Sequence, residues 1–226
     1  MLALIAIGLL LALLYGPQLW VRAVMAAHSR EREDFPGTGG QFAAHLIDRL
    51  ELDGVSVEAN EAGDHYDPDR RVVALSQANY QGRSLTAVAV AAHEVGHALQ
   101  HQTGYRPLRL RHRLVRAVTA IQRVGSILVM ASPLLLLASR SPTGLVVPLA
   151  GGLVSVAAGA VVHLVTLPVE LDASFRRALP VLNRDYLPPA DRPRARRILT
   201  AAALTYVAAS LASILNVWYW LRLLRR

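Results

Sequence analysis

The chain has 226 residues, a formal net charge of +8 and no cysteine, and each of its 24 basic residues is an arginine. The absence of lysine excludes a P-loop phosphate site and a lysine Schiff base, and the absence of cysteine excludes disulfides, thiol catalysis and cysteine-ligated zinc. Hydrophobic residues make up 53% of the chain and charged residues only 18%, whereas soluble domains are about a quarter charged. This composition favours an integral membrane protein.

Four apolar stretches are long enough to cross a bilayer, which requires about 20 residues. We interpret residues 1–25 as a transmembrane anchor rather than a cleaved signal peptide, because no basic residue precedes the apolar run. Two transmembrane helices are expected over 115–169, and a fourth, ending in an aromatic cluster and a basic tail, over 198–226. The expected fold class is therefore mainly α, with about four transmembrane helices.

The segment 26–114 is the only sizeable soluble stretch. Apolar residues at helical spacing predict helices over 41–52 and 84–102. Short apolar runs next to turn residues predict strands over 55–57 and 72–75. These elements indicate a small α+β soluble segment.

The placement of arginines predicts the orientation in the membrane. More arginines flank the expected spans on the side that holds 26–114 and the connection 170–197 than on the other side, so both segments are expected in the cytoplasm. The arginine clusters are expected to contact anionic membrane lipids. A nucleic-acid surface would require aromatic residues among the arginines on a soluble face, and we expect no nucleic-acid partner.

A metal-binding pattern lies within the predicted helix 84–102. His93 and His97 are one helical turn apart and about 40° apart around the axis, so both imidazoles can reach one metal ion. Glu94 lies on the same side of the helix. A separate apolar stripe, more than 90° from either histidine, allows the helix to pack while it presents ligands; it consists of Leu85, Val88, Ala92, Val95 and Leu99. The pattern predicts a metal site, and two ordinary surface histidines are the alternative.

Catalytic zinc requires a third protein ligand and an open position for water. His101 lies about 12 Å along the helix axis from His93, too far to share an ion, so a role beside the site or at the helix end is expected for it. Glu170 is the better candidate, because a carboxylate at the end of an apolar span is costly unless it is paired or bound to metal. The alternative is an ion pair of Glu170 with Arg176 or Arg177.

A second polar cluster spans Asp64–Asp69 and has the composition of a turn. In an alternative interpretation, His65 or Tyr66 donates a hydrogen bond to the reaction's oxyanion, and one of the aspartates orients a ligand imidazole.

Three motifs of this chain are similar to those of one known family: Ala91–Ala98, Asp64–Pro68 and Leu167–Ser174. With them the chain resembles the bacterial membrane zinc metallopeptidases often called the YugP-like family, from its first span through the connection 170–197. The resemblance implies a neutral zinc peptidase of the bacterial plasma membrane, with several spans and a gluzincin-like soluble segment. A peptidase of this family is distantly similar to membrane proteases of the HtpX and CAAX-protease type.

The resemblance also implies residue roles. His93, His97 and Glu170 would bind one zinc ion, and Glu94 would be the catalytic residue. The distant relatives place an aspartate four residues after the ligand glutamate. That position holds Ser174 here, and the nearest acid, Asp172, is the candidate for orienting a ligand.

We therefore expect hydrolysis of peptide bonds in membrane or membrane-proximal proteins, with Glu94 as general base. Residues 72–75 are predicted to form an edge strand to which an extended substrate adds. One rival function is a non-enzymatic membrane scaffold stabilised by zinc. The other is a metal transporter that uses His163, Glu170 and Arg123 inside the bilayer.

Overall fold

The structure is a computed structural model that describes residues 2–204; for residues 2–7, 9–11, 13–14 and 142 it describes the backbone only. The chain divides into two compact units, which are described separately. The first contains Met1–Leu108 and Pro168–Thr205, and the described part of the second is Arg109–Leu167.

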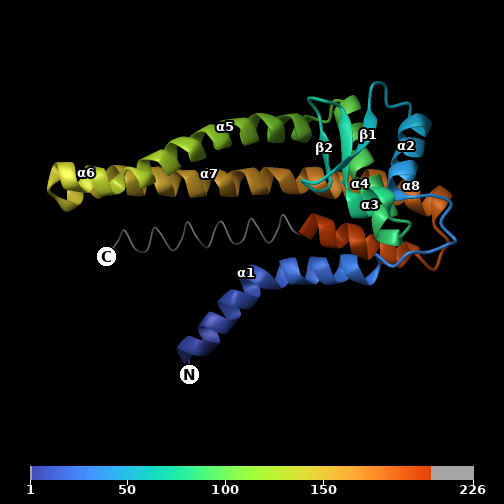
Figure 1. The fold of residues 1–226 in the computed structure, drawn as a ribbon, viewed down its shortest axis with the longest axis horizontal. Coiled ribbons are helices and arrows are strands. Elements are labelled where there is room, and N and C mark those ends of the chain that lie inside the picture. The colour runs from blue at the N-terminus through green and yellow to red at the C-terminus, as the bar shows by residue number, and fades with distance from the viewer. Residues whose placement is uncertain (1, 205–226) are drawn as a thin grey trace. The chain divides into compact units, whose positions relative to one another are not determined.

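The first expected span is helical: α1 covers Leu2–Ala27 and includes Pro17 (Figure 1). Its last turns join the core of the first unit, where Val24 is buried and the Met25 carbonyl oxygen accepts a hydrogen bond from Thr86 Oγ1 at 2.9 Å. The C-terminal end of α1 is therefore attached to the helix that carries the histidines.

Helix α2 covers Gly39–Arg49, whereas the sequence predicts a helix over 41–52. The earlier start is explained by a capping box, in which Gln41 Oε1 accepts from the Thr38 backbone N–H and Thr38 Oγ1 accepts from the Gln41 N–H. The earlier end coincides with Glu51, whose φ of +51° takes the chain out of the helical conformation.

The sheet has three strands in the order β1-β3-β2: β1 (Ser56–Asn60), β2 (His65–Asp67) and β3 (Val72–Ser76). β3 pairs in parallel with β1 and antiparallel with β2. The prediction of 72–75 as an edge strand is therefore wrong. Its residues form a continuous buried apolar run, as expected for a strand with neighbours on both sides.

The predicted turn over 64–69 is also only partly correct. Residues His65–Asp67 form β2, and the turn is confined to the residues that follow. The pairing with β3 gives this polar segment its strand conformation, which its composition does not indicate.

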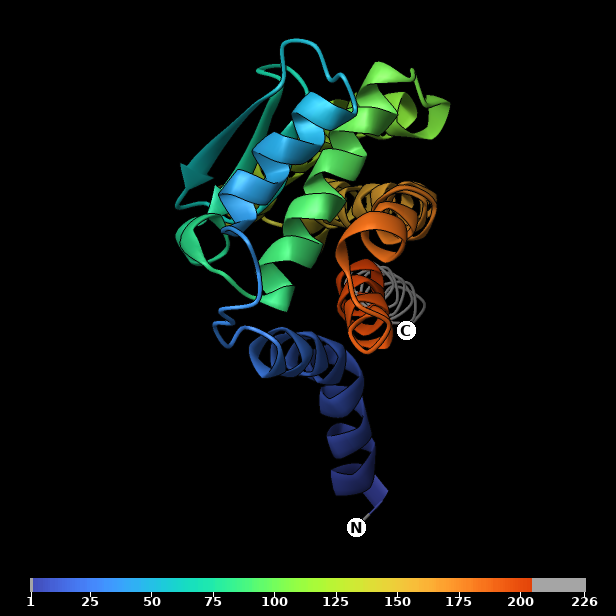
Figure 2. The same cartoon turned by 90° about the vertical axis from the view of Figure 1, so that its right-hand side faces the viewer.

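The helix predicted over 84–102 is confirmed. A short helix, α3 (Gln77–Gln81), precedes it, and α4 covers Leu85–Gln102 with Ser84 Oγ accepting from the Ala87 N–H at 3.1 Å. Helices α2 and α4 lie side by side and both pack against the sheet (Figure 2). Nearly every residue of α4 is buried, including both histidines.

The connection expected over 170–197 is largely helical. Helix α7 (Val146–Leu171) continues through the π-helix η2 (Asp172–Ala178), the short α8 (Leu179–Val181) and the π-helix η3 (Leu182–Tyr186), and residues 192–204 form a further helix. Between them, the buried carboxylate of Asp191 pairs with Arg32 at 2.7 Å and Arg194 at 2.9 Å.

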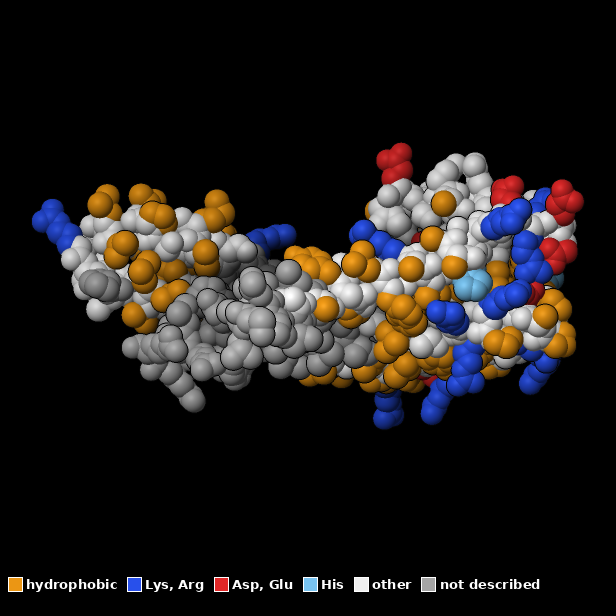
Figure 3. All heavy atoms as spheres, turned by 90° about the horizontal axis from the view of Figure 1, so that it is seen from below, with side chains coloured by type: hydrophobic (Ala, Val, Ile, Leu, Met, Phe, Trp, Pro, Cys, Tyr) orange, Lys and Arg blue, Asp and Glu red, His pale blue; other side chains and the backbone are white. Residues whose placement is uncertain are grey.

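In the second unit, α5 (Arg106–Met130) is followed by α6 (Ser132–Ser139), η1 (Pro142–Leu145) and the first part of α7. Apolar side chains gather over α6 and the adjoining turns of α5 and α7 (Figure 3), and among them Met130 is 80% exposed and Leu137 is 76% exposed. Such a surface is typical of a lipid-facing helix.

By length and composition, one helix among the described residues, Thr143–Tyr186, can cross a membrane. The pair α5 and α6, bent by 49° at its break, is a second candidate if it forms one span. The described residues therefore provide one or two candidate spans instead of the expected four. The fourth expected span, 198–226, lies outside the described residues beyond residue 204.

A close approach between α4 and η2 depends on a glycine. A Cβ on Gly96 would lie 2.9 Å from the Ala173 carbonyl oxygen, which is closer than real Cβ contacts. The sequence between the two histidines thus allows the backbones of α4 and η2 to meet.

Gly96→Ala is expected to lower the free energy of unfolding by about 1–3 kcal/mol, because the new methyl group must displace backbone rather than a flexible side chain. The measurement is a thermal unfolding midpoint in detergent. Gly152→Ala is the matched control, since its Cβ would meet Val129 Cγ2 at an ordinary 3.5 Å. Equal midpoints for the two variants would contradict the inferred close packing.

Candidate metal centre

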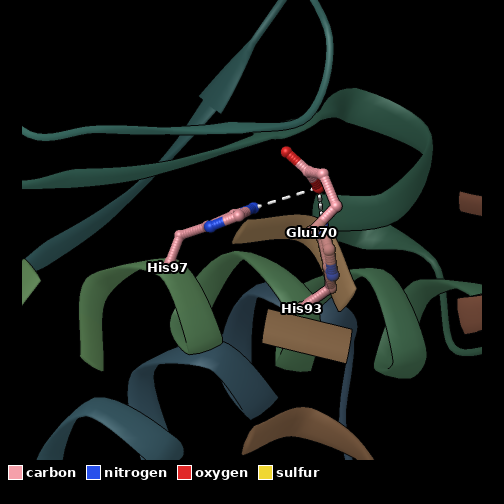
Figure 4. A group of neighbouring side chains, drawn as sticks. All are labelled: His93, His97 and Glu170. Atoms are coloured by element: carbon pink, nitrogen blue, oxygen red, sulfur yellow. Dashed lines mark hydrogen bonds and ion pairs between the residues drawn. The ribbon is translucent and has the colours of Figure 1, made fainter. Parts of the chain in front are cut away.

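Three buried side chains of the first unit converge on one point (Figure 4): His93 and His97 from α4 and Glu170 from the last turn of α7. Their ligand atoms all lie within 4.8 Å of one another. Glu170 Oε2 is 3.1 Å from His93 Nε2 and 3.4 Å from His97 Nε2. The structure thus brings together the three residues predicted as metal ligands.

The two histidines are positioned by the helix itself. Residues four apart lie on the same face of an α-helix, and the two rings stand edge to face with their centroids 4.7 Å apart. Glu170 comes from far along the chain, and it reaches the histidines because η2, which begins two residues after it, packs closely on α4.

Gln100 determines which nitrogen of His97 carries the proton. Gln100 is fully buried, and its Nε2 donates to the Val169 carbonyl oxygen and to Asp172 Oδ2, both at 2.8 Å. Because both amide hydrogens are used, the atom 2.9 Å from His97 Nδ1 is the acceptor Oε1, and Nδ1 is the donor. A neutral His97 therefore directs the lone pair of Nε2 toward Glu170.

Asp172, which the sequence suggested as a residue that orients a ligand, contacts His97 only indirectly, through Gln100. Its Oδ2 accepts hydrogen bonds from Gln100 Nε2 and, at 2.7 Å, from Arg177 Nε. It thereby fixes the orientation of the Gln100 amide, which in turn bonds His97. Arg177, which on sequence grounds was an alternative partner of Glu170, makes this bond to Asp172.

His93 is supported by a different residue. Ser174 Oγ lies 3.0 Å from His93 Nδ1, and both side chains are buried. Ser174 occupies the position four residues after Glu170, where the distant relatives carry an aspartate. A neutral hydroxyl therefore orients this imidazole in place of a carboxylate.

Sequence reasoning missed the roles of Gln100 and Ser174. The available signal for Gln100 was an amide side chain about one turn after His97, between the ligand face and the apolar stripe. Because its partners are 69 and 72 residues away along the chain, no local pattern indicates them.

The donor set fits one zinc ion. His97 Nε2 and Glu170 Oε2 are electron-rich atoms that face each other in a buried environment, and a cation between them removes their repulsion. Tetrahedral zinc with bonds of about 2.1 Å separates neighbouring ligand atoms by about 3.4 Å, close to the two separations found here. Two histidines and one carboxylate also form a known catalytic zinc donor set that leaves a position for water.

Glu94, the predicted catalytic residue, is also buried, at 7% exposed, and directly follows His93 on α4. His65 is exposed on β2, and its Nδ1 bonds the Gly63 carbonyl oxygen. Tyr66 shares a 2.8 Å hydrogen bond with His101 Nδ1, and His101 is not part of the group of His93, His97 and Glu170.

Asp67 bonds within the turn that follows it, whereas Asp64 bonds to the end of β3 and to α3. Asp64 accepts from the Ser76 backbone N–H and from Asn79 Nδ2, and Asp67 accepts from the backbone N–H groups of the two residues after Pro68. The supports of the ligand imidazoles are Ser174 and Gln100 instead, and Asp67 fits the turn interpretation.

Gln100→Leu is expected to weaken zinc binding by about 10- to 100-fold, because His97 loses the acceptor that orients it. The readout is zinc affinity, measured by competition with a chromophoric chelator. Gln81→Leu, an exposed change at the end of α3, is the control and should bind as the wild type does. Wild-type affinity in Gln100→Leu protein would show that this bond does not position the ligand.

Comparison with known proteins agrees with this centre. Residues 2–225 match the family model described as "Putative neutral zinc metallopeptidase". A Bacillus subtilis (strain 168) protein named "Putative membrane protease YugP" is 37% identical over 209 residues, which cover 92% of this chain and 89% of the relative. No solved structure matches the chain significantly.

The resemblance seen in the three sequence motifs is thereby confirmed over nearly the whole chain. The buried His93, His97 and Glu170 of the chain form a group that could hold a metal ion. The chain belongs to the neutral zinc metallopeptidase family that this model describes.

Proposed function

We propose that this protein is a membrane-embedded zinc-dependent endopeptidase that hydrolyses peptide bonds of membrane or membrane-proximal proteins. The observation that carries the proposal is the buried group of His93, His97 and Glu170, with Glu94 on the same helix. The family match and the membrane protease among the relatives support the same reaction class.

His93, His97 and Glu170 would hold the zinc ion. A bound zinc ion supplies Lewis acidity and lowers the pKa of water to near neutrality. Glu94 accepts the proton of the attacking water and returns it to the leaving amine. Gln100 and Ser174 keep the two imidazoles oriented, and the burial of all these groups limits competing water.

The membrane setting is part of the proposal. Glu170 lies on the helix Thr143–Tyr186, which is long and apolar enough to cross a bilayer. On the basis of the arginine distribution, we place the centre near the cytoplasmic membrane surface of a bacterial cell. The apolar stretches of the sequence are the basis for about four spans, of which the described residues contain one or two candidates. Substrates would then be cleaved close to the lipid boundary.

A non-enzymatic, zinc-stabilised scaffold is the rival function, because the same three ligands also tie α4 to α7. A metal transporter is less well supported. Among the residues that the structure describes, His93, His97 and Glu170 form the one cluster suited to a metal ion, and a transport path needs several.

Glu94→Gln is expected to bind zinc as the wild type does while its proteolytic rate falls by about 100-fold or more, since the general base is lost. The measurements are zinc per chain and cleavage of a casein probe by purified protein in detergent. Glu61→Gln, in the exposed turn after β1, is the matched control. Undiminished proteolysis in the Glu94→Gln protein would refute the mechanism, and an inactive wild type would favour the scaffold.

Glu170→Ala is expected to weaken zinc binding by more than about 100-fold, because loss of a direct ligand exceeds the effect of losing a supporting residue. Zinc content after dialysis, determined by elemental analysis, tests this expectation. Glu61→Ala should retain wild-type zinc. An unchanged ratio of metal to protein in the Glu170→Ala variant would remove this residue from the ligand set.

A further inference from the structure

A cavity whose lining does not include the metal ligands lies next to α4 in the first unit. Its volume is about 280 Å³, and its polar lining includes Tyr66 of β2, His101 of α4, and Arg71 and Asp53 from the turns beside them. His101 is one helical turn beyond the ligand His97, or about 6 Å along the axis. Ala98, the residue directly after His97, also lines the cavity, so the cavity adjoins the part of α4 that carries this candidate ligand.

Arg71 is exposed and contributes to this cavity a guanidinium group without an ion-pair partner among the described residues. Its Nη1 contacts only the Asp53 main-chain oxygen, at 3.3 Å, and among the described residues no carboxylate forms an ion pair with it. The adjacent Arg70, in contrast, is bonded to both carboxylate oxygens of Glu58 at 2.8 Å. Arg71 also has a φ of +54°, a conformation that costs free energy and that recurs at functional sites.

Tyr66 and His101 contribute a hydrogen-bond donor to the same cavity. Burial raises the pKa of the Tyr66 hydroxyl, so this group stays protonated at neutral pH. The phenol and a neutral imidazole together carry two hydrogens on polar atoms, and their mutual 2.8 Å bond uses one of them. Whichever tautomer His101 adopts, one hydrogen remains available for a ligand.

We propose that this cavity is a substrate subsite that binds a carboxylate through Arg71 and the remaining donor of the Tyr66–His101 pair. The inference rests on the proposed peptidase function, and it makes acidic peptides the preferred substrates. The carboxylate is either the side chain of Asp or Glu or the C-terminus of the peptide.

Asp53 provides a test of the charge of the bound group. Its exposed carboxylate also lines the cavity, so it repels a bound anion and attracts a bound cation. Asp53→Asn therefore strengthens carboxylate binding, whereas Arg71→Gln weakens it. A cavity that binds a cationic group responds in the opposite direction to both changes.

The experiment measures fluorescence anisotropy on zinc-loaded, full-length Glu94→Gln protein, so that binding is recorded without cleavage. The probes are fluorescein-labelled, alanine-rich octapeptides with a single Glu or Gln at each position in turn. Each peptide is prepared with a C-terminal carboxylate and with a C-terminal amide, which separates the two sources of the charged group.

We expect one carboxylate position to bind about tenfold tighter than its amide counterpart. Arg71→Gln should remove that difference, Arg71→Lys should keep part of it, and Arg70→Gln should leave it unchanged. Zinc content and the thermal midpoint of each variant verify that it is folded.

The proposal is overturned if no probe binds, if the preference survives Arg71→Gln, or if Asp53→Asn weakens binding of the acidic peptide. Its failure is distinguishable from failure of the proposed peptidase. If the protein prefers the carboxylate peptide but the wild type cleaves no substrate, the carboxylate subsite stands and the proposed peptidase function is rejected. If the wild type is proteolytically active but shows no preference for the carboxylate peptide, the peptidase function stands and the subsite is rejected.

Discussion

The metal centre depends on the close packing of α4 against the helical turn that follows Glu170. Gly96 permits this packing because it lacks the Cβ that would meet the Ala173 carbonyl oxygen. Gln100 then joins the two elements through its bonds to Val169 and Asp172. Without this contact, the histidines and the glutamate would belong to separate helices with no reason to converge.

The same contact surrounds the buried Glu170 with two imidazoles, and a cation bound between them would compensate its charge. Glu170 is 1% exposed, and a carboxylate in such surroundings is tolerated only with compensating partners. Each imidazole uses Nδ1 for a bond to its support, Ser174 or Gln100, and directs Nε2 toward the glutamate. This arrangement holds the ligands in one geometry before any substrate binds, which is the preorganisation that catalysis requires.

One helix carries both a candidate metal ligand and a candidate membrane span. Thr143–Tyr186 has the length and composition of a membrane span, and it carries the third ligand and the η2 turn that packs on α4. The exposed apolar side chains of α5, α6 and α7 provide a surface suited to lipid. Glu170 therefore lies where the apolar part of this helix ends.

The sequence alone determined the features that depend on neighbours within a few residues. The four-residue spacing placed His93 and His97 on one face of α4, and a carboxylate at the end of an apolar run identified Glu170. Only the tertiary structure decided which elements meet. It placed the apolar run 72–75 at the centre of the sheet and made 65–67 a strand, because pairing partners determine both. It also revealed Gln100 and Ser174 as supports, since their bonds join residues about 70 to 80 positions apart, and no local periodicity encodes such a contact.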